Sequence, residues 1–312
     1  MAQADIIIPD HRTCGVLIAH NRLLEADAGA RVRRALLKAD IGLRVMAADD
    51  LAAAAPVTIG VVVHVVYNDA PGNISDAQIA SQIDALNRDY SHANPDAAQA
   101  PGVWRGLQLD CKIRFKLATR DPNGAPTNGI TRTQTQTPVF STDDSVKSAA
   151  SGGADPWDST RYLNLWVCDL GGGLLGYAQF PGMPAATDGV VILNQAFGTM
   201  GTAAAPYNMG RTAVHEVGHW FDLHHIWGDT TDCSGSDLVS DTPNQQHPNY
   251  GTPAFPHVSC NNGPNGDMFM NYMDYVNDAA MVMFTAGQSA RMQATLQGPR
   301  ASVIAAAATV AP

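Results

Sequence analysis

Apolar and polar positions after residue 56 first follow a strand-like pattern. Val57–Tyr67 is a run of β-branched residues with little polarity, which is typical of a strand buried on both faces. Shorter apolar runs predict further strands at residues 112–119, 162–168 and 189–193. The first half of the chain therefore supplies most of a sheet.

Helical spacing occurs between and around these strands. Ser75 predicts the N-cap of a helix that runs to Tyr90, because its apolar positions share one face, at Ile79, Ile83 and Leu86. A second helix is predicted near Gln288–Leu296, and a short charged helix at His20–Lys38. Strand, helix and strand in alternation predict an α/β fold built on a mixed sheet.

The periodicity is lost at two places. Residues 47–56 are typical of a linker, which would separate an N-terminal appendage, residues 1–55, from the body of the chain. From Gly228 to Asn271 the chain is rich in Gly, Pro, Asn, Asp and Ser. An irregular stretch of that length inside a compact domain needs bound ions or a disulfide to hold it.

Composition and charge exclude several classes of function. With 45% hydrophobic and 15% charged residues the chain is expected to fold, and no stretch is apolar for long enough to span a membrane. The formal net charge of −10 is carried entirely by residues 51–312, because residues 1–50 have 7 basic and 7 acidic side chains. An acidic body disfavours nucleic acid and suits calcium and basic peptides.

The strongest chemical signal is His-Glu-Val-Gly-His-Trp-Phe-Asp-Leu-His-His, from His215 to His225. Histidines four apart lie on one face of a helix, so His215 and His219 can bind one zinc ion. Glu216 is placed to take a proton from water activated by that metal. His225 can supply the third ligand of a catalytic zinc site if the helix, with Asn208 as its expected cap, ends before it.

These residues resemble the metzincin signature HExxHxxGxxH, and their surroundings are similar to the pappalysin family of metzincin peptidases. The resemblance also rests on residues 61–68, Leu175-Gly-Tyr-Ala-Gln-Phe-Pro181, Asp188-Gly-Val-Val-Ile192 and Asn271-Tyr-Met-Asp-Tyr275. It covers most of residues 57–290 and implies a metzincin catalytic domain at residues 56–312. Its upper part (56–222) would carry the sheet and the zinc helix, and its lower part (223–312) the methionine turn and the last helix.

The resemblance assigns roles to two residues of the last motif. Met273 would form the turn beneath the metal, and Tyr275 would approach the metal and stabilise the reacting oxyanion. Asp222 departs from the pattern, because metzincins have glycine there, at a turn that needs positive φ. We expect the turn to survive at a cost of about 1 kcal/mol. Alternatively Asp222 contacts a histidine, or His224 replaces His225 as a ligand.

The first of the five cysteines is the candidate for latency. Cys14 lies in Arg12-Thr-Cys-Gly15, which resembles pappalysin precursors in which a thiolate fills the open metal position. Residues 1–55 would then be an inhibitory prosegment. An odd number of cysteines also leaves at least one without a disulfide partner.

Two other pairs of cysteines remain. Cys233 and Cys260 resemble a pappalysin disulfide that would close the irregular stretch and add about 3 kcal/mol of stability. Cys111 and Cys168 are expected to be buried thiols, with a bridge between them as the alternative.

Further ligands follow from the resemblance. Asp278 matches a position of the S1′ pocket where a carboxylate receives a basic side chain, which predicts cleavage before Arg and, less readily, before Lys. The Leu43–Arg44 bond would then be a point of self-activation. Calcium would bind at Asp237, Asp241 and Thr242. For both sites the alternative is a solvated acidic turn.

The sequence thus predicts a secreted or extracytoplasmic zinc endopeptidase, made as a latent precursor and monomeric, although its first residues do not read as a signal peptide. Peptide or protein substrates would lie along the edge segment 176–181. The alternative is a zinc-dependent module that binds peptides without cutting them. Asp222 favours that alternative, and the intact Glu216 speaks against it.

Overall fold

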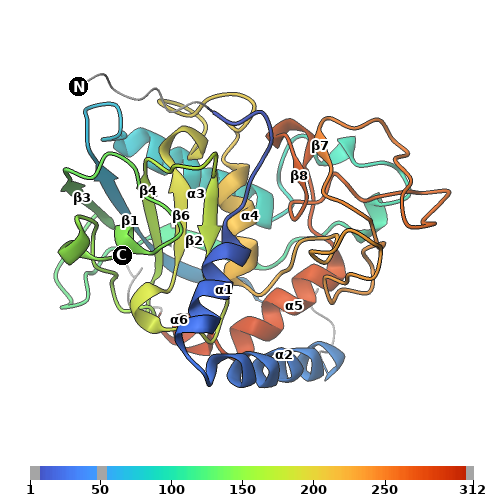
Figure 1. Cartoon of the computed structure of the whole chain (residues 1–312), viewed down its shortest axis with the longest axis horizontal. Helices are drawn as coiled ribbons and strands as arrows, with labels where there is room; N and C mark the ends of the chain where they lie inside the picture. Colours follow the sequence, from blue (N-terminus) through green and yellow to red (C-terminus); the bar gives the residue numbers. More distant parts are fainter. Residues whose placement is uncertain (1–7, 48–54, 307–312) are drawn as a thin grey trace.

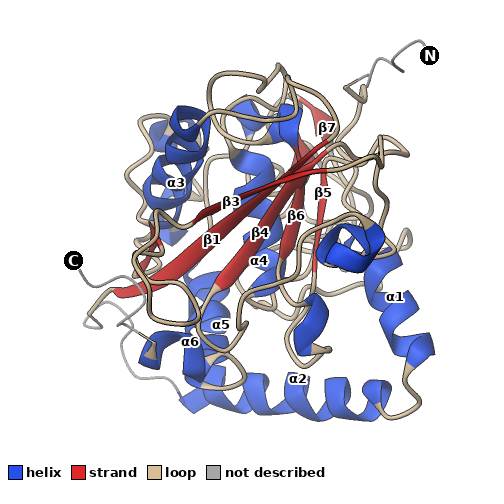
Figure 2. Ribbon diagram, turned by 90° about the vertical axis from the view of Figure 1, so that its left-hand side faces the viewer, coloured by secondary structure: helices blue, strands red, loops and turns tan. Residues whose placement is uncertain are grey.

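A six-stranded sheet forms the centre of the protein, and the computed structural model describes residues 8–47 and 55–306 of the chain (Figure 2). The strand order is β2-β1-β4-β6-β5, and β3 follows β2 along the same edge of β1. Only β5 runs antiparallel to its neighbour within this sheet. The strands are β1 Val57–Tyr67, β2 Ile113–Leu117, β3 Ile130–Gln134, β4 Leu163–Cys168, β5 Gly176–Ala178 and β6 Val190–Leu193.

All four strands predicted from apolar runs are present as β1, β2, β4 and β6. The second begins one residue later than predicted, because Lys112 has a φ of 57° and cannot belong to an extended strand, and it ends at Leu117. β3 was not predicted, because its sequence Ile-Thr-Arg-Thr-Gln is mostly polar. The residues of β3 are half-buried or exposed at the sheet edge. Its pairing with β1, which is distant in sequence, makes it a strand.

Helices cover the sheet and close the molecule below it. The predicted cap is confirmed for α3 Asp76–Tyr90, since the Ser75 side chain accepts a hydrogen bond from the Gln78 amide at 3.1 Å. α4 Arg211–Trp220 packs against α3, β5 and β6. The predicted C-terminal helix is α5 Ala286–Gln297, followed by α6 Ala301–Ala305.

The N-terminal appendage forms two helices, not the single short one predicted at His20–Lys38. They are α1 Val16–Ala26 and α2 Ala30–Ala47. The break occurs because Asp27 has an extended backbone and its carboxylate accepts a hydrogen bond from the Gly29 amide at 2.8 Å. α1 contacts β5 and α2 contacts α5, so both helices lie against the body of the protein (Figure 1). Most of the predicted linker, residues 48–54, lies outside the described residues.

The lower part is irregular, as predicted (right-hand side of Figure 1). Between α4 and α5 the chain forms only the short parallel pair β7 Tyr250–Gly251 and β8 Tyr275–Val276, apart from single turns. The predicted disulfide joins Cys233 to Cys260, whereas Cys111 and Cys168 are buried free thiols without a bridge. Among the described residues no helix is long and apolar enough to cross a membrane.

Candidate active site

Helix α4 begins with an unusual cap. The predicted cap residue, Asn208, is wrong: the N-cap is Gly210, whose φ of 76° favours glycine, and it has no side chain to accept a hydrogen bond. Asp278 supplies the acceptor from another part of the chain. Its Oδ2 atom accepts hydrogen bonds from the amides of Met209 at 2.7 Å and Arg211 at 3.3 Å. The start of this helix is therefore fixed to the segment that follows β8.

Three histidine side chains meet at the other end of α4. The Nε2 atom of His219 lies 3.1 Å from the Nε2 atoms of both His215 and His225. All three rings are buried. Such close approach of neutral imidazole nitrogens leaves their lone pairs facing one point, as ligands of one metal ion require.

Each of these rings is oriented through its other nitrogen. His215 Nδ1 lies 2.7 Å from the Tyr272 carbonyl oxygen, and His219 Nδ1 lies 2.8 Å from that of Leu223. His225 Nδ1 lies 2.5 Å from Asp229 Oδ1. These acceptors place the proton on Nδ1 and leave Nε2 free for a metal. The sequence interpretation did not include Asp229, although an acidic residue four positions after His225 was the available signal.

The turn between the second and third histidines is formed in spite of Asp222. This residue has a φ of 72°, as the glycine of the metzincin pattern would. Its carboxylate does not contact a histidine in the structure; it binds Arg291 and Arg34. His224 is not in the cluster either, because its ring stacks on Phe180 with a centroid distance of 5.0 Å. His225 therefore takes the third place.

Cys14 reaches this cluster from the appendage. Its Sγ atom and one nitrogen of each histidine lie within 4.8 Å of one another. The thiol donates a hydrogen bond to Glu216 Oε2 at 3.3 Å, and the Cys14 amide donates one to the Tyr275 hydroxyl at 3.3 Å. Burial raises the pKa of Glu216 to about 8, and burial together with Glu216 raises the pKa of the Cys14 thiol. A bound Zn²⁺ would reverse the second shift, because a coordinating thiol loses its proton.

Met273 lies directly beneath α4. It is fully buried, and a Cβ atom at Gly218 would lie 2.6 Å from its Sδ atom. A larger residue at position 218, between the two helical histidines, would therefore displace the Met273 sulfur. Met273 thus lies against the helix that carries His215 and His219, which is where the sequence predicts a methionine turn.

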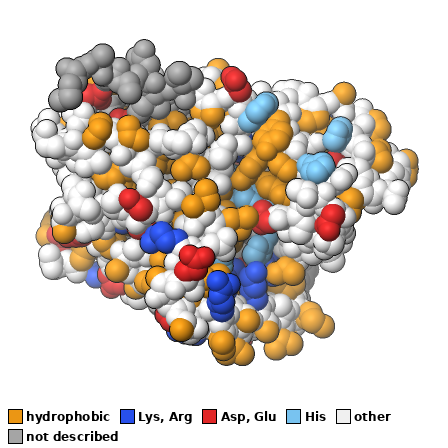
Figure 3. Space-filling model, in the orientation of Figure 1, with side chains coloured by type: hydrophobic (Ala, Val, Ile, Leu, Met, Phe, Trp, Pro, Cys, Tyr) orange, Lys and Arg blue, Asp and Glu red, His pale blue; other side chains and the backbone are white. Residues whose placement is uncertain are grey.

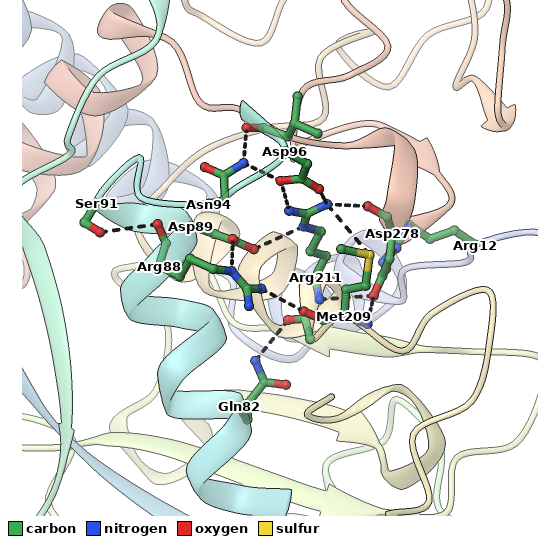
Figure 4. A network of polar contacts seen from close by, with 12 residues as sticks. Arg12, Gln82, Arg88, Asp89, Ser91, Asn94, Asp96, Met209, Arg211 and Asp278 are labelled. Atoms are coloured by element: carbon green, nitrogen blue, oxygen red, sulfur yellow. Dashed lines mark hydrogen bonds and ion pairs between the residues drawn. The ribbon is translucent and has the colours of Figure 1, made fainter. Parts of the chain in front are cut away.

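Asp278 is fully buried, which rules out the solvated turn as its environment. Its Oδ1 atom accepts a hydrogen bond from Arg12 Nη2 at 2.6 Å (Figure 4). The same guanidinium donates from Nη1 to Thr212 Oγ1 at 3.0 Å and from Nε to the Val276 carbonyl oxygen at 3.2 Å, and it lies over the Tyr207 ring. Arg12 precedes Cys14 by two residues, so the appendage fills the histidine cluster and this arginine pocket together.

Arg211 holds the pocket in place. Its guanidinium binds Asp96 through two hydrogen bonds of 2.7 Å, Asp89 at 3.2 Å and the Asp278 carbonyl oxygen at 2.8 Å (Figure 4). Because Arg211 is also the first residue of α4, it joins α4, α3 and the Asp278 segment in one polar network. This role was missed in the sequence, where Arg211 is an isolated basic residue.

Comparison with known proteins assigns the family. Residues 146–297 match the peptidase M43 family, described as Pregnancy-associated plasma protein-A. An extracellular metalloprotease of Pyricularia oryzae is 35% identical over 288 residues, which cover 89% of this chain and 86% of the relative. The chain belongs to the M43, or pappalysin, family of metallopeptidases.

Other relatives match this pappalysin along most of its length. An extracellular metalloprotease of Arthroderma otae is 31% identical over 308 residues, 96% of each protein. A promirolysin variant of Tannerella forsythia is 47% identical with a TM-score of 0.88, over 96% of this chain and 100% of that one. Mature mirolysin in complex with a cleaved peptide is 52% identical with a TM-score of 0.81, over 83% and 100%.

The predicted fold and activity are thereby confirmed. This pappalysin is a zinc-dependent peptidase with the metzincin fold, and peptides are its substrates. A non-catalytic binding module is excluded by the same relatives, and Glu216 is in place beside the histidine cluster.

The three residues predicted to bind calcium do not meet at one point in this pappalysin. Asp237 is buried and accepts hydrogen bonds from Thr242 Oγ1 at 2.9 and 2.8 Å. Asp241 is turned toward the start of α5, where it binds the Thr285 hydroxyl at 2.7 Å and the Gly287 amide at 2.8 Å. Burial raises the pKa of Asp237 to about 7. Asp237 is therefore not part of a solvated turn.

Proposed function

We propose that this pappalysin is a latent endopeptidase whose catalytic Zn²⁺ is bound by His215, His219 and His225, with Cys14 as the fourth ligand in the precursor. The observation that carries this is the approach of the four ligand atoms within 4.8 Å. Three oriented imidazoles and one thiol are a donor set that zinc prefers. Residues 1–55 are then the prosegment and residues 56–312 the catalytic domain.

Zinc bound there supplies Lewis-acid activation of water and of the scissile carbonyl group. Glu216, which lies beside the histidine cluster, would accept the proton of the attacking water and pass it to the leaving amine. The Tyr275 hydroxyl, which meets the Cys14 amide in the precursor, donates to the oxyanion when substrate replaces the prosegment.

Latency follows from the position of Cys14. A thiolate on the metal excludes the water that the reaction needs, and its contact with Glu216 also occupies the general base. The prosegment further pairs with the edge of the sheet, since the Gly15 amide donates to the Gly176 carbonyl oxygen at 2.8 Å. Substrate would use this same edge, so it cannot enter until the prosegment leaves.

We assign the preference for a basic residue after the scissile bond to Asp278. Arg12 occupies the pocket in the precursor as the side chain of a substrate would, with three separate acceptors around one guanidinium. Lysine presents a single ammonium group and cannot reach all three, so arginine is preferred.

The direction of the prosegment explains why it is not cut here. Cys14 pairs in parallel with Gly176 of β5, and Arg12 precedes the metal site. A substrate arginine follows its scissile bond. To place that arginine in the same pocket, a substrate must run in the opposite direction, antiparallel to β5.

Three further properties belong to this proposal. Activation occurs at Leu43–Arg44, in the last turn of α2. Calcium binds near Asp237 and Thr242, whose buried oxygens suit a hard cation. The protein is secreted, in keeping with relatives named extracellular metalloproteases, and it acts as a monomer.

A digest of a peptide library by protein cleaved before Arg44, with Glu216→Ala as the inactive control, tests the activity and its specificity together. We expect zinc-dependent cleavage with Arg, then Lys, after the cut. Cleavage without a basic residue at that position would refute the role of Asp278. Equal cleavage by the Glu216→Ala variant would refute the role of Glu216.

A further inference from the structure

Three arginines of residues 8–47 each bind an aspartate of the catalytic domain. Arg12 binds Asp278, Arg22 binds Asp144 and Arg34 binds Asp222. All three carboxylates are buried, with side-chain exposures of 0%, 5% and 0%. Basic and acidic side chains lie close together over the lower part of the face shown in Figure 3, where α1 and α2 lie. Only the first of these pairs belongs to the active site.

Of the two remaining pairs, Arg34 and Asp222 are the more deeply buried. The Arg34 side chain is 4% exposed, and its guanidinium lies over the Phe180 ring at 4.9 Å. Asp222 Oδ1 receives Arg34, while Oδ2 receives Arg291 Nη2 at 2.5 Å. Two nitrogens of Arg34 have no hydrogen-bond partner, so the ion pair and the ring hold this arginine.

The pair of Arg22 and Asp144 is built in the same way. Asp144 binds Lys147 Nζ at 2.8 Å within the catalytic domain, and Arg22 adds a second cation from outside. Arg22 Nε also donates to the Thr142 carbonyl oxygen at 3.2 Å. This site lies along α1, away from the histidine cluster.

Each aspartate therefore keeps a partner of its own when the prosegment is absent. Asp144 keeps Lys147, Asp222 keeps Arg291, and Asp278 keeps two amides of α4. When the prosegment leaves, each of the three carboxylates therefore still has a partner within the catalytic domain. A surface with carboxylates that are already fixed and partly satisfied can bind and release arginines without rearrangement.

The metal site does not explain the aspartate at position 222, whereas its arginine partners do. Metzincins have glycine at this turn, and aspartate at a φ of 72° is strained where glycine is not. The carboxylate does not contact a histidine, so the metal site gives no reason for it. Its two partners are Arg291 and the prosegment residue Arg34.

We propose that Asp144 and Asp222, with Phe180, form a docking surface that holds the prosegment independently of Cys14, so that the cleaved prosegment stays bound as a reversible inhibitor of the mature enzyme. The occupant is residues 8–43 of this chain, which lie before the proposed cut and place Arg22 and Arg34 on the surface. The inference rests on the proposed cleavage of the prosegment, but the surface itself does not depend on zinc or catalysis.

The test uses the full chain made inactive by Glu216→Ala, with the recognition sequence of an unrelated protease in place of residues 50–54. After cutting, the release of the prosegment is followed by native mass spectrometry and size-exclusion chromatography. Cys14→Ser is included in every variant to remove the bond between sulfur and metal. We expect the cut Cys14→Ser protein to remain a complex of the two fragments.

Arg34→Met keeps an apolar stem over Phe180 and removes the charge, and it should speed release at least about tenfold. Arg22→Met should act in the same direction. The matched control is Arg33→Met on the same helix, because Arg33 is 54% exposed and pairs with Asp27 within the prosegment. This control should release at the parent rate.

Asp222→Gly restores the metzincin residue and tests the other side of the contact. It should speed release as much as Arg34→Met, and the two changes together should add nothing more. Zinc content and the melting temperature of each variant identify a folding defect. Parent-like release by both Arg34→Met and Asp222→Gly, or immediate release by Cys14→Ser alone, would overturn the proposal. A failed peptide digest with intact docking would instead refute only the catalytic assignment.

Discussion

Arg12 and Asp278 are joined by an ion pair of 2.6 Å at a carboxylate that already performs another task. Asp278 Oδ1 receives the guanidinium, while Oδ2 accepts the amides that begin α4. The residue that receives a basic side chain is therefore also the cap of the helix that carries two histidines of the cluster. The proposed specificity and the start of α4 would then depend on one side chain.

Two substitutions at this position should separate the two tasks. Asp278→Asn keeps an oxygen for the amides of α4 and loses the charge, so it should abolish the preference for arginine and change stability little. Asp278→Ala loses both, and removal of a cap costs about 1 kcal/mol. Cleavage profiles and melting curves of the two variants measure this. An Asp278→Ala protein with the parent's preference would contradict the assignment.

Cys14→Ala should shorten the lag before the precursor processes itself, while Arg22 and Arg34 still hold the prosegment. Loss of the sulfur opens the fourth metal position to water and frees Glu216, so we expect the lag before cleavage to fall at least about tenfold. Time courses on gels measure the lag. Cys111→Ala is the control, because this buried free thiol lies outside the cluster. A zinc-loaded Cys14→Ala precursor as silent as the parent would disprove the switch.

Tyr275→Phe tests the hydroxyl alone. The ring contacts with His215 and His225 remain, so zinc binding and KM should change little, while kcat falls about 100-fold through loss of an oxyanion donor. Steady-state kinetics on a peptide with arginine after the cut provide both constants. An unchanged kcat would refute the role of the hydroxyl as an oxyanion donor and leave Tyr275 with packing contacts alone.

Calcium should stabilise the Glu216→Ala protein at about pH 8 and much less at about pH 5.5. Burial raises the pKa of Asp237 to about 7 from its ordinary value near 3.8, so the folded state holds a proton there that the unfolded state has lost. This contribution to stability falls as pH rises through that window. Above about pH 7 the buried Asp237 carboxylate is negatively charged, and a bound calcium ion would neutralise that charge.

Thermal melts with and without millimolar calcium test this at both pH values. We expect a gain of roughly 3 °C at the higher pH. Asp237→Asn should lose the gain and, without calcium, melt above the parent at about pH 8. Identical melts of the parent with and without calcium would refute calcium binding at this site.

Patterns with a short period predicted much of the fold. The β-branched run of β1, the cap at Ser75 and the spacing of His215, His219 and His225 are local signals, and the structure has all of them in place. The odd number of cysteines and the resemblance also led to Cys14 at the cluster and to the Cys233–Cys260 disulfide.

Contacts between distant segments could not be predicted in the same way. Asp278 replaces Asn208 as the acceptor at α4 from almost 70 residues away, and Asp229 orients His225 through a turn that has no regular period. The pair of Arg34 and Asp222 spans 188 positions. A spacing rule describes one helix or strand, whereas these pairs depend on where the whole chain brings carboxylates and arginines together.

The position of Leu43–Arg44 inside α2 has a kinetic consequence. A protease binds its substrate in an extended form, but Arg44 is in the last turn of a helix, pairs with Asp40 at 2.7 Å and donates to the Gln297 carbonyl oxygen at 3.0 Å. The bond can be cut only while that turn is open. Since each precursor's own cleft is filled by Cys14 and Arg12, the cut must come from another, already active molecule. Activation should therefore follow a sigmoidal time course that steepens with protein concentration and shortens when a trace of mature enzyme is added.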